Sequence, residues 1–560
     1  MSSATLPPRS SDGPAGPILG SAPHGTQYVA DGAHFDVIVV GSGFGGSVSA
    51  LRLAEKGYTV LVLEKGRRLR AADFPKTNWN LKRWLWMPAL GFRGLFKMTF
   101  FRHVTIFSGV GVGGGSLVYA NTLPMPSDEF FTAPSWGALA DWKTELAPHY
   151  ATARRMLGAT KNPRMTKGDE VLREIATDIG RAEHFESNDV AVFFGKARET
   201  VADPFFGGEG PERTGCHSCG ACMTGCRHGA KNTLDKNYLW LAERRGVRIQ
   251  PDAEVRAVRP REGGGYRVEA VLRRGFARHR KLALTADRVV LAGGVLGTVD
   301  LLLRMKEDPA GLPKLPPRVG DRVRTNSEAL IGVITPRRDL DLTEGIAITS
   351  ILHTDAYSHI EPVRYGRGSG FFRLMVSPHV GPGGFFARMW SATRRFFKKP
   401  GRWLKAFFVW DWAKHTQILL YMRTLDGTLA LGLKRRPWRF FKKTAATRIS
   451  EGEAPKASMP EATDLAERFA DKIGGVPASI LTETVFGIPS TAHILGGACM
   501  GASAADGVID HRHQVFGYDG LYVVDGAAVS ANPGVNPSLT ITALAERAMA
   551  QLPAKGGPRA

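Results

Sequence analysis

The chain has 560 residues, 43% of them hydrophobic, so it is long enough for two or more domains with a large core. Its formal net charge of +22 favours an anionic partner, either nucleic acid or an anionic membrane surface. Four of its five cysteines fall between residues 216 and 226, whereas a secreted scaffold held by disulfides would spread its cysteine pairs along the chain.

Residues 1–33 are rich in Pro, Gly and Ser and lack the apolar segment of a secretory signal. We therefore expect a disordered leader over residues 1–33. We also expect a cytoplasmic protein, either free or peripheral on the inner face of the membrane. No run of the sequence reaches the ~20 apolar residues of a membrane-spanning helix.

A dinucleotide-binding pattern follows the leader. A buried strand is predicted over 35–40, a helix over 47–56 and a second strand over 59–63. Between the first strand and the helix stand the three glycines of a G-x-G-x-x-G motif, and an acid ends the second strand: Gly41, Gly43, Gly46 and Glu64. The glycines allow a tight turn, close approach of a pyrophosphate and close helix packing, while the acid can accept hydrogen bonds from ribose hydroxyls. This pattern alone does not separate FAD from NAD.

Further stretches resemble the glucose–methanol–choline (GMC) oxidoreductases. They are SGVGVGGGSLVYANTLPMP at 108–126, VVLAGGVLGTVDLLLRM at 289–305, TAHILGGACMG at 491–501 and LYVVDGAAVSANPGVNPSLTITALAERAM at 521–549. The order, spacing and residues of these stretches are similar to those of the cholesterol-oxidase-like branch of that family. The resemblance implies non-covalent FAD and an α/β fold, in which a Rossmann-like FAD-binding domain is joined to an α+β substrate domain built on an antiparallel sheet.

The resemblance also implies domain boundaries and flavin-binding residues. Residues 34–130, 215–330 and 485–553 would form the FAD-binding domain, and residues 131–214 and 331–484 the substrate-binding domain. Backbone N–H groups of glycines would lie against the flavin ring, with polar side chains at its edge, and an acid would lie near the phosphate–ribitol chain. These residues are Gly113, Gly114, Gly115, Ser116, Asn121, Asp525, Gly526 and Asn536.

Two residues match the catalytic pair of the family. His493 lies in H-I-L-G-G-A-C-M-G, where Ile494 replaces the usual Pro, and Asn536 opens a helix predicted over 538–549. Alcohol oxidation requires the hydroxyl proton to leave as hydride moves to the flavin, and a histidine titrates in a suitable range for that transfer. We therefore expect His493 to act as general base or proton relay and Asn536 to hold the substrate oxygen.

Steroid-transforming members of the family also use a carboxylate, which moves a proton during double-bond isomerisation. Glu361 and Asp426 are weak candidates, and a solvated surface acid is the favoured interpretation of each. Isomerisation is therefore left open.

The cysteines follow the C-x2-C-x2-C-x3-C spacing with which bacterial ferredoxins bind a four-iron cluster. They are Cys216, Cys219, Cys222 and Cys226, with Arg227 where ferredoxins carry Pro. Three alternatives stay open: an iron–sulfur cluster that would make the enzyme a dehydrogenase, a zinc site, or reduced thiols in a tight loop. Cys499 reads as a buried packing residue.

Aromatic and basic residues alternate over 79–103, 383–415 and 434–443. Such stretches are typical of segments that lie in a lipid headgroup layer, although they can also line a cavity or form a solvated face. No nucleic-acid recognition module accompanies them.

The function expected from these features is FAD-dependent oxidation of the CH–OH group of a sterol or another bulky lipophilic alcohol, with electrons passing to oxygen or another acceptor. A long-chain aliphatic alcohol dehydrogenase with an iron–sulfur relay, and a non-catalytic membrane-associated flavoprotein, are the alternatives.

Overall fold

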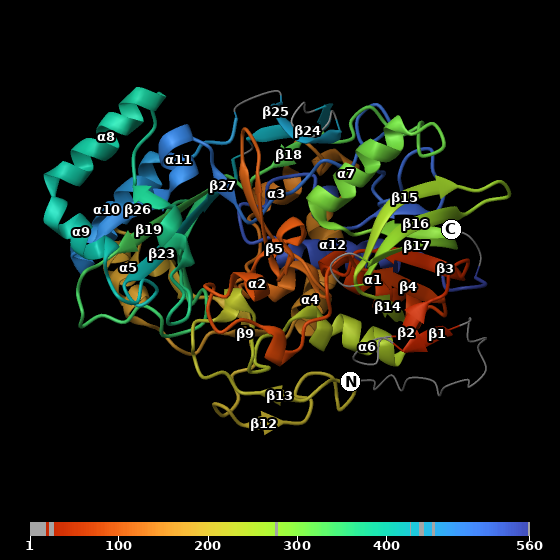
Figure 1. The fold of residues 1–560 in the computed structure, drawn as a ribbon, viewed down its shortest axis with the longest axis horizontal. Helices are drawn as coiled ribbons and strands as arrows, with labels where there is room; N and C mark the ends of the chain where they lie inside the picture. Colours follow the sequence, from red (N-terminus) through yellow and green to blue (C-terminus); the bar gives the residue numbers. More distant parts are fainter. Residues whose placement is uncertain are drawn as a thin grey trace.

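The structure is a computed structural model that describes residues 18–21, 27–274, 278–425, 427–435, 442–450 and 454–557. Two large sheets lie side by side along the longest axis of the molecule, and the long helix α8 (Phe385–Lys398) extends at one end of it (Figure 1). Among the described residues, no helix is long and apolar enough to cross a membrane.

The first sheet is the dinucleotide-binding one. Its strands are β14 (Arg248–Gln250), β4 (Val60–Leu63), β3 (His34–Val40), β17 (Arg278–Leu291), β28 (Leu521–Val523), β16 (Tyr266–Arg274) and β15 (Ala253–Pro260). The strands β14, β4, β3, β17 and β28 pair in parallel, whereas β16 and β15 add an antiparallel edge. Parts of the chain nearly 500 residues apart therefore meet in one sheet.

Helices cover this sheet. They are α1 (Phe44–Glu55), α4 (Trp142–Met156), α6 (Tyr238–Arg244), α7 (Gly294–Glu307) and α12 (Ser538–Ala550). The helix α1 packs on α6 and α12, and α12 packs on α4. The helix α1 begins three residues before the predicted start, because Gly43 already ends the turn after β3.

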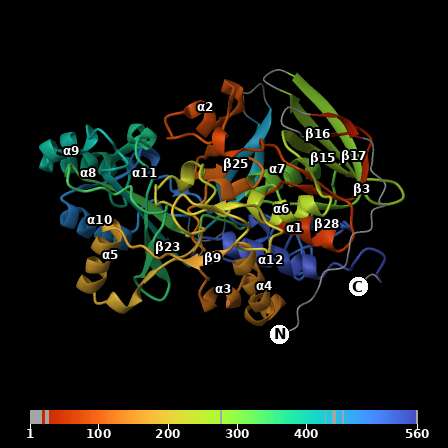
Figure 2. The same cartoon turned by 90° about the horizontal axis from the view of Figure 1, so that it is seen from below.

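The second sheet is antiparallel throughout. In order, its strands are β10 (Phe185–Ser187), β20 (Ser350–His353), β21 (Ser358–Val363), β23 (Thr416–Arg423), β19 (Glu328–Ile334), β26 (Val476–Ile480) and β22 (Val376–Pro378). The helices α5 (Lys167–Asp178) and α10 (Pro460–Ile473) bury apolar residues against one face of it (Figure 2). The architecture is the predicted α/β dinucleotide domain joined to an antiparallel substrate domain.

Short elements complete the chain. Two-stranded sheets are formed by β1 (Ile18–Ser21) with β2 (Gln27–Val29), β5 (Trp86–Met87) with β6 (Phe92–Arg93), β9 (Ala159–Lys161) with β11 (Asp189–Ala191), and β12 (Thr200–Val201) with β13 (Arg213–Thr214). Three-stranded sheets are formed by β7 (Phe96–Phe100), β8 (Thr105–Gly109) and β27 (Ser490–Thr491), and by β18 (Val323–Arg324), β24 (Thr428–Arg435) and β25 (Lys443–Ile449). The remaining helices are α2 (Leu81–Trp84), α3 (Asp128–Thr132), α9 (Pro400–Phe407) and α11 (Leu481–Phe486).

The prediction of a disordered leader through residue 33 is wrong for its last part. The strand β2 pairs with β1, and Val29 is buried and donates its N–H to Oε1 of Gln250. This contact holds the chain against β14 from about residue 27 onward. Residues 1–17 and 22–26 of the leader lie outside the described residues.

Candidate active site

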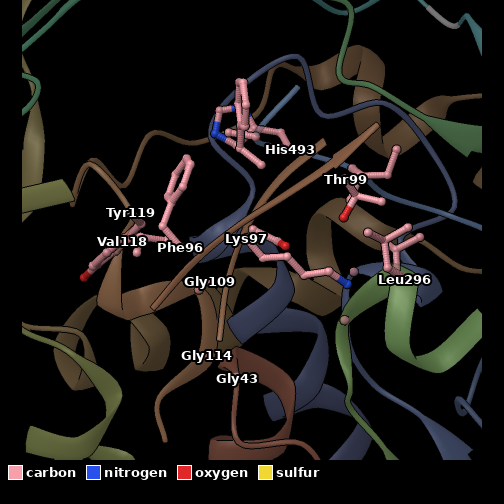
Figure 3. A pocket seen from close by; sticks show the side chains of 18 of the residues that line it. Gly43, Phe96, Lys97, Thr99, Gly109, Gly114, Val118, Tyr119, Leu296 and His493 are labelled. Carbon is pink, nitrogen blue, oxygen red and sulfur yellow. The ribbon is translucent and has the colours of Figure 1, made fainter. Parts of the chain in front are cut away.

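One large cavity of about 650 Å³ runs between the two sheets. Glycine-rich loops of the first sheet line one end of it, and apolar side chains of the second sheet line the other. Figure 3 shows Gly43, Gly109 and Gly114 on one side of the β7 residues Phe96 and Lys97, and His493 on the other. The cavity therefore has a backbone-rich lobe and an apolar lobe, which meet near His493.

Backbone at the glycine-rich lobe leaves space for a ligand. A Cβ added at Gly43, Gly294 or Gly297 would meet no protein atom within 4 Å, and all three residues line the cavity. By contrast, a Cβ at Gly46 would lie 2.1 Å from the carbonyl oxygen of Gly41, so Gly46 is required for α1 to pack on the turn. These positions match the second and third roles of the dinucleotide fingerprint.

The charges in this lobe suit a dinucleotide. Lys65 and Lys97 line it and offer positive charge to a diphosphate, whereas Arg256 and Arg304, which also line it, are paired with Glu254 and Asp300. Burial, helped by the neighbouring charge of Lys65, lowers the pKa of Lys97 to about 8. The Lys97 side chain extends toward Leu296 (Figure 3), and the buried Thr99 hydroxyl nearby has no protein partner. The residues present therefore fit FAD.

The two acids predicted for the cofactor both line the cavity. Glu64 accepts hydrogen bonds from the N–H and hydroxyl of Ser42 and from the N–H of Gly66, so it fixes the first glycine turn. Asp525 accepts from the N–H of Gly294 and the hydroxyl of Thr298, and it thereby ties β28 to the start of α7. Burial raises the pKa of Asp525 to about 6. Gly526 lines the cavity beside it.

Some residues of the loop after β8 line the cavity, and others hold the loop in place. Gly114 and Gly115 line the cavity, and a Cβ at Gly114 would lie 2.7 Å from the Cα of Gly43, so two glycine turns touch here. Gly113 and Ser116 instead support the loop: the Gly113 N–H donates to the Ser42 hydroxyl, and the Ser116 hydroxyl accepts from the N–H of Leu234. Asn121 is fully buried beside Cys222 and is not part of the cavity wall, so its role at the flavin edge stays a prediction.

At the junction of the lobes, His493 and Asn536 lie together. Nδ1 of His493 is 2.7 Å from Oε2 of Glu328, a fully buried carboxylate on β19. This contact holds a ring proton on Nδ1 and leaves Nε2 facing the Asn536 amide, 3.5 Å away. With Nδ2 of Asn536 directed at Glu361, the amide oxygen is the atom on this side, and it can accept from Nε2–H when the ring is protonated. Burial alone would lower the pKa of His493, but the charge and hydrogen bond of Glu328, with the charge of Glu361, raise it. The structure thus brings the two predicted catalytic residues together.

Glu361 stands directly behind Asn536. With the amide oriented to satisfy its neighbours, Nδ2 of Asn536 donates to Oε1 and Oε2 of Glu361 at 3.2 and 3.1 Å. Nδ2 of Asn188 donates to Oε1 as well, at 3.1 Å. Burial raises the pKa of Glu361 to about 7, although the hydrogen bond from Asn188 and the charge of His493 oppose this shift.

The interpretation of Glu361 as a solvated surface acid is therefore wrong. Its side chain has no exposed surface, because β21 is a central strand of the second sheet. Glu361 is the cross-strand partner of Leu420, which lines the cavity, but Glu361 itself is not part of the cavity wall and reaches it through Asn536, which is. Asp426 lies outside the described residues.

The apolar lobe is walled mainly by large side chains of the second sheet and of β7 and β8. They include Phe96, Phe107, Tyr365, Phe372, Trp412 and Leu420. Some of the aromatics in the predicted basic and aromatic stretches thus line the cavity, namely Phe96, Phe101 and Trp412. Others are exposed, most of them on or just after α8 and α9.

The four cysteines all line a second, smaller cavity, together with apolar residues such as Val192, Ala230 and Ile346. Burial raises the pKa of the Cys216 thiol to about 12 and that of Cys222 to about 11. His217, Cys219 and His228 bring their donor atoms within 4.8 Å of one another. Cys499 is buried away from this group.

Sequence reasoning missed Glu328, Lys97, Thr99 and the two histidines of the cysteine loop. Glu328 and Glu361 each begin or interrupt an apolar strand, and a carboxylate in such a strand is a signal of a buried functional group. Lys97 and Thr99 alternate with apolar residues along β7, a pattern shared by many structural strands, so nothing local distinguishes them.

Two family models described as GMC oxidoreductase match residues 211–322 and 428–545, and one described as NAD(P)-binding Rossmann-like domain matches residues 39–94. The chain is 45% identical over 533 residues to a cholesterol oxidase of Mycobacterium tuberculosis (strain CDC 1551 / Oshkosh), covering 93% of this chain and 92% of the relative. It is 41% identical to a cholesterol oxidase of Acinetobacter baumannii, covering 93% and 95%. The chain belongs to the GMC oxidoreductase family.

A solved structure, pyridoxine 4-oxidase from Mesorbium loti, shares the fold with a TM-score of 0.58 at 15% identity, covering 92% of this chain and 98% of that one. The chain is also 25% identical to the long-chain-alcohol oxidase FAO4B of Arabidopsis thaliana, covering 91% of this chain and 66% of the relative. This GMC oxidoreductase is thus an FAD-dependent alcohol-oxidising enzyme of the cholesterol-oxidase-like branch, as the resemblance implied.

Proposed function

We propose that this enzyme oxidises the 3β-hydroxyl group of a cholesterol-like sterol to a ketone. The observation that carries the proposal is the position of His493 and Asn536 at the junction between the FAD lobe and a lobe walled by aromatic side chains. The relatives named cholesterol oxidase, at 41–45% identity over more than nine tenths of the chain, support the sterol class.

Bound FAD supplies the hydride acceptor. Nε2 of His493 takes the hydroxyl proton, because Nδ1 is committed to Glu328 and only Nε2 faces the cavity. The Asn536 amide holds the substrate oxygen and so orients the C–H bond that breaks. The start of α12 directly after Asn536 and Pro537 brings the positive end of a helix to the same place, where negative charge develops.

Glu361 serves the second half of a sterol reaction. A carboxyl with a pKa near 7 can both accept and return a proton at neutral pH, which is what movement of a double bond into conjugation with the new carbonyl requires. Oxidation of a saturated alcohol has no such step. The buried Glu361 therefore favours a sterol over a long-chain aliphatic alcohol, the candidate that the similarity to FAO4B supports.

A surface patch on α8 and α9 fits collection of such a substrate from lipid. Phe386, Trp390 and Phe397 are largely exposed on α8, and Phe408 and Trp410 follow α9. Exposed cations surround them: Arg394, Lys398, Lys399 and Lys405. Aromatic side chains beside cations favour the headgroup layer of an anionic bilayer. The helix α9 packs on β26, whose Ala478 and Ile480 line the cavity, so the patch adjoins the apolar lobe.

The proposal therefore places a cytoplasmic enzyme on the inner face of the membrane, with oxygen as the acceptor that the oxidase relatives favour. The test is an anaerobic flavin spectrum recorded on addition of cholesterol or hexadecanol. Bleaching by cholesterol at least tenfold faster than by hexadecanol is expected. Preferential bleaching by hexadecanol would replace the sterol with the aliphatic alcohol, and no bleaching by either would reject both.

A further inference from the structure

The loop that carries the four cysteines is folded into a ring around a cavity. Ser218, Gly220 and Gly225 have positive φ angles of 59°, 68° and 96°, which turn the chain between successive cysteines. The loop is fixed to the substrate domain, because the N–H of Gly220 donates to the carbonyl of Gly345 and the N–H of Gly345 donates to that of Ser218. All four cysteines line the enclosed space.

The spacing of the sulfurs argues against a single metal ion shared by the four. Four thiolates on one tetrahedral zinc would lie about 3.8 Å apart, from a Zn–S bond of about 2.3 Å. Of these four described cysteines, no three bring their sulfurs within 4.8 Å of one another. An iron–sulfur cluster holds its thiolates farther apart, because iron and sulfide atoms lie between them.

One buried basic residue, Lys231, lines the same space, and a second, Arg213, lies behind Ala230 of its wall. The Lys231 ammonium donates to the carbonyls of Leu117, Tyr119 and Cys222, and the Arg213 guanidinium donates to the carbonyls of Gly229 and Ala230 and to Asn232. Within the described part of the chain, neither has a carboxylate within 4 Å, and each is about 1% exposed. The charge of the buried Asp235 acts on both at longer range, and a cluster on four thiolates would add net negative charge to their surroundings.

The cysteine cavity shares a wall with the flavin cavity. Cys222 lines the first and its chain neighbour Met223 lines the second. Tyr119 and Ala120 also line the flavin cavity, and Lys231 joins the Tyr119 carbonyl to the Cys222 carbonyl. The two sites are therefore separated by about one residue of chain.

We propose that Cys216, Cys219, Cys222 and Cys226 bind a four-iron, four-sulfide cluster that takes electrons from the reduced flavin. This electron transfer from flavin to cluster rests on the proposed function in one respect, because alcohol oxidation supplies the electrons. Each alcohol yields two electrons and two protons; the protons go to solvent, and the cluster passes the electrons singly to two equivalents of a one-electron acceptor such as a cytochrome. Oxygen then becomes an alternative acceptor at the flavin.

The test is chemical analysis and electron paramagnetic resonance of the full-length holoprotein, purified without oxygen. About four iron and four acid-labile sulfide per chain are expected, with a signal that appears on reduction by dithionite. The double variant Cys216→Ser/Cys226→Ser should lose iron and keep FAD, whereas Cys499→Ser, the matched buried cysteine outside the cavity, should keep both. The double variant should also reduce cytochrome c at least tenfold more slowly, with flavin bleaching by alcohol unchanged.

Two results would overturn the proposal. One is FAD-replete protein with less than about half an iron per chain after reconstitution with ferrous iron and sulfide. The other is about one zinc per chain that persists in Cys216→Ser/Cys226→Ser and is lost in His217→Ala/His228→Ala, which would assign the site to the histidines and Cys219. Because none of these measurements of iron, sulfide and zinc uses an alcohol, their outcome is independent of whether a sterol is the substrate.

Discussion

Nδ1 of His493 lies 2.7 Å from the buried carboxylate of Glu328, so the proposed base, which stands on a loop, is held by a strand of the second sheet. This contact makes Glu328 a positioning residue: it fixes which ring nitrogen is free, and its charge raises the pKa of His493.

Replacement of Glu328 should change the pH profile of flavin reduction. In Glu328→Gln the charge that raises the pKa of His493 is lost, so neutral His493 persists to lower pH and the rising limb of the profile should shift to lower pH. The maximal rate should fall about tenfold or more, because the ring tautomer is less firmly fixed. Anaerobic stopped-flow across pH 5–9 measures both. Glu483→Gln is the matched control, since Glu483 is also a buried acid but contacts Ser490 instead. An unshifted profile would contradict the assignment.

Removal of the imidazole should affect turnover and spare the cofactor. His493→Ala should lower the rate of flavin reduction by about 10²-fold or more, while the flavin content stays that of the wild-type enzyme. Flavin absorbance per chain and single-turnover kinetics check the two statements. A flavin-replete variant of undiminished rate would remove His493 from the mechanism.

Replacement of Glu361 should separate oxidation from isomerisation. The Glu361→Gln variant should still bleach its flavin with cholesterol, but the unconjugated ketone should accumulate in place of the conjugated one, which ultraviolet absorbance distinguishes. Because the pKa of Glu361 is about 7, its carboxylate predominates above pH 7, so wild-type isomerisation of added 5-cholesten-3-one should rise through pH 7 and decline below it. Equal isomerisation by both proteins would leave the carboxyl with a structural role.

Addition of one methyl group at Gly43 should weaken FAD binding without disturbing the packing of the protein. Gly43→Ala places its Cβ where no protein atom lies within 4 Å, at a φ of −72° that alanine accepts, so the apoprotein should fold and yet bind FAD more weakly. Gly432→Ala is the control, because its Cβ is also unobstructed but lies on β24, outside the cavity. Thermal unfolding and FAD titration test this pair. Equal FAD affinity in both variants would show that Gly43 does not approach the dinucleotide.

Loss of two aromatic side chains should weaken lipid binding. Phe386→Ser/Trp390→Ser should reduce binding to phosphatidylserine-containing vesicles tenfold or more, since burial of each ring in lipid contributes about 1.5–3 kcal/mol. Trp240→Ser alters an exposed tryptophan on α6, remote from α8 (Figure 1), and should bind as the wild type does. Co-sedimentation at low salt measures this. Equal binding by the double variant would assign the patch to another partner.

Local sequence patterns predicted the position of those helices, strands and turns that carry a recognisable short motif. The turn at Gly41–Gly46, strand β3 and helix α12 fall within a few residues of their predicted bounds, because backbone approach to a phosphate and helix packing restrict those positions to particular residues. His493 and Asn536 were predicted as site residues in the same way, from the residues that flank them in the sequence.

An apolar strand around Glu328 and Glu361 signals that these acids are buried, but local sequence does not show which residues they contact. Glu361 sits among the ordinary residues of HIEPV, and only the pairing of β21 with β23 makes it a core position behind Asn536, which is 175 residues later in the chain. The contacts of Lys231 likewise form only when the segment after the cysteine loop folds against the loop at residues 117–119. Such relations depend on tertiary pairing and carry no signature in spacing.

The parallel sheet has a consequence for how the holoenzyme matures. The strand β28 pairs with β17, and Asp525 accepts a hydrogen bond from the start of α7. Both come from far along the chain, yet they lie at the same cavity as the first glycine turn. A nascent chain on the ribosome therefore lacks one wall of the flavin site until residues beyond 520 have emerged. We expect FAD to be captured after synthesis is nearly finished, so that cofactor supply acts on completed apoprotein and incompletely synthesised chains do not compete for it.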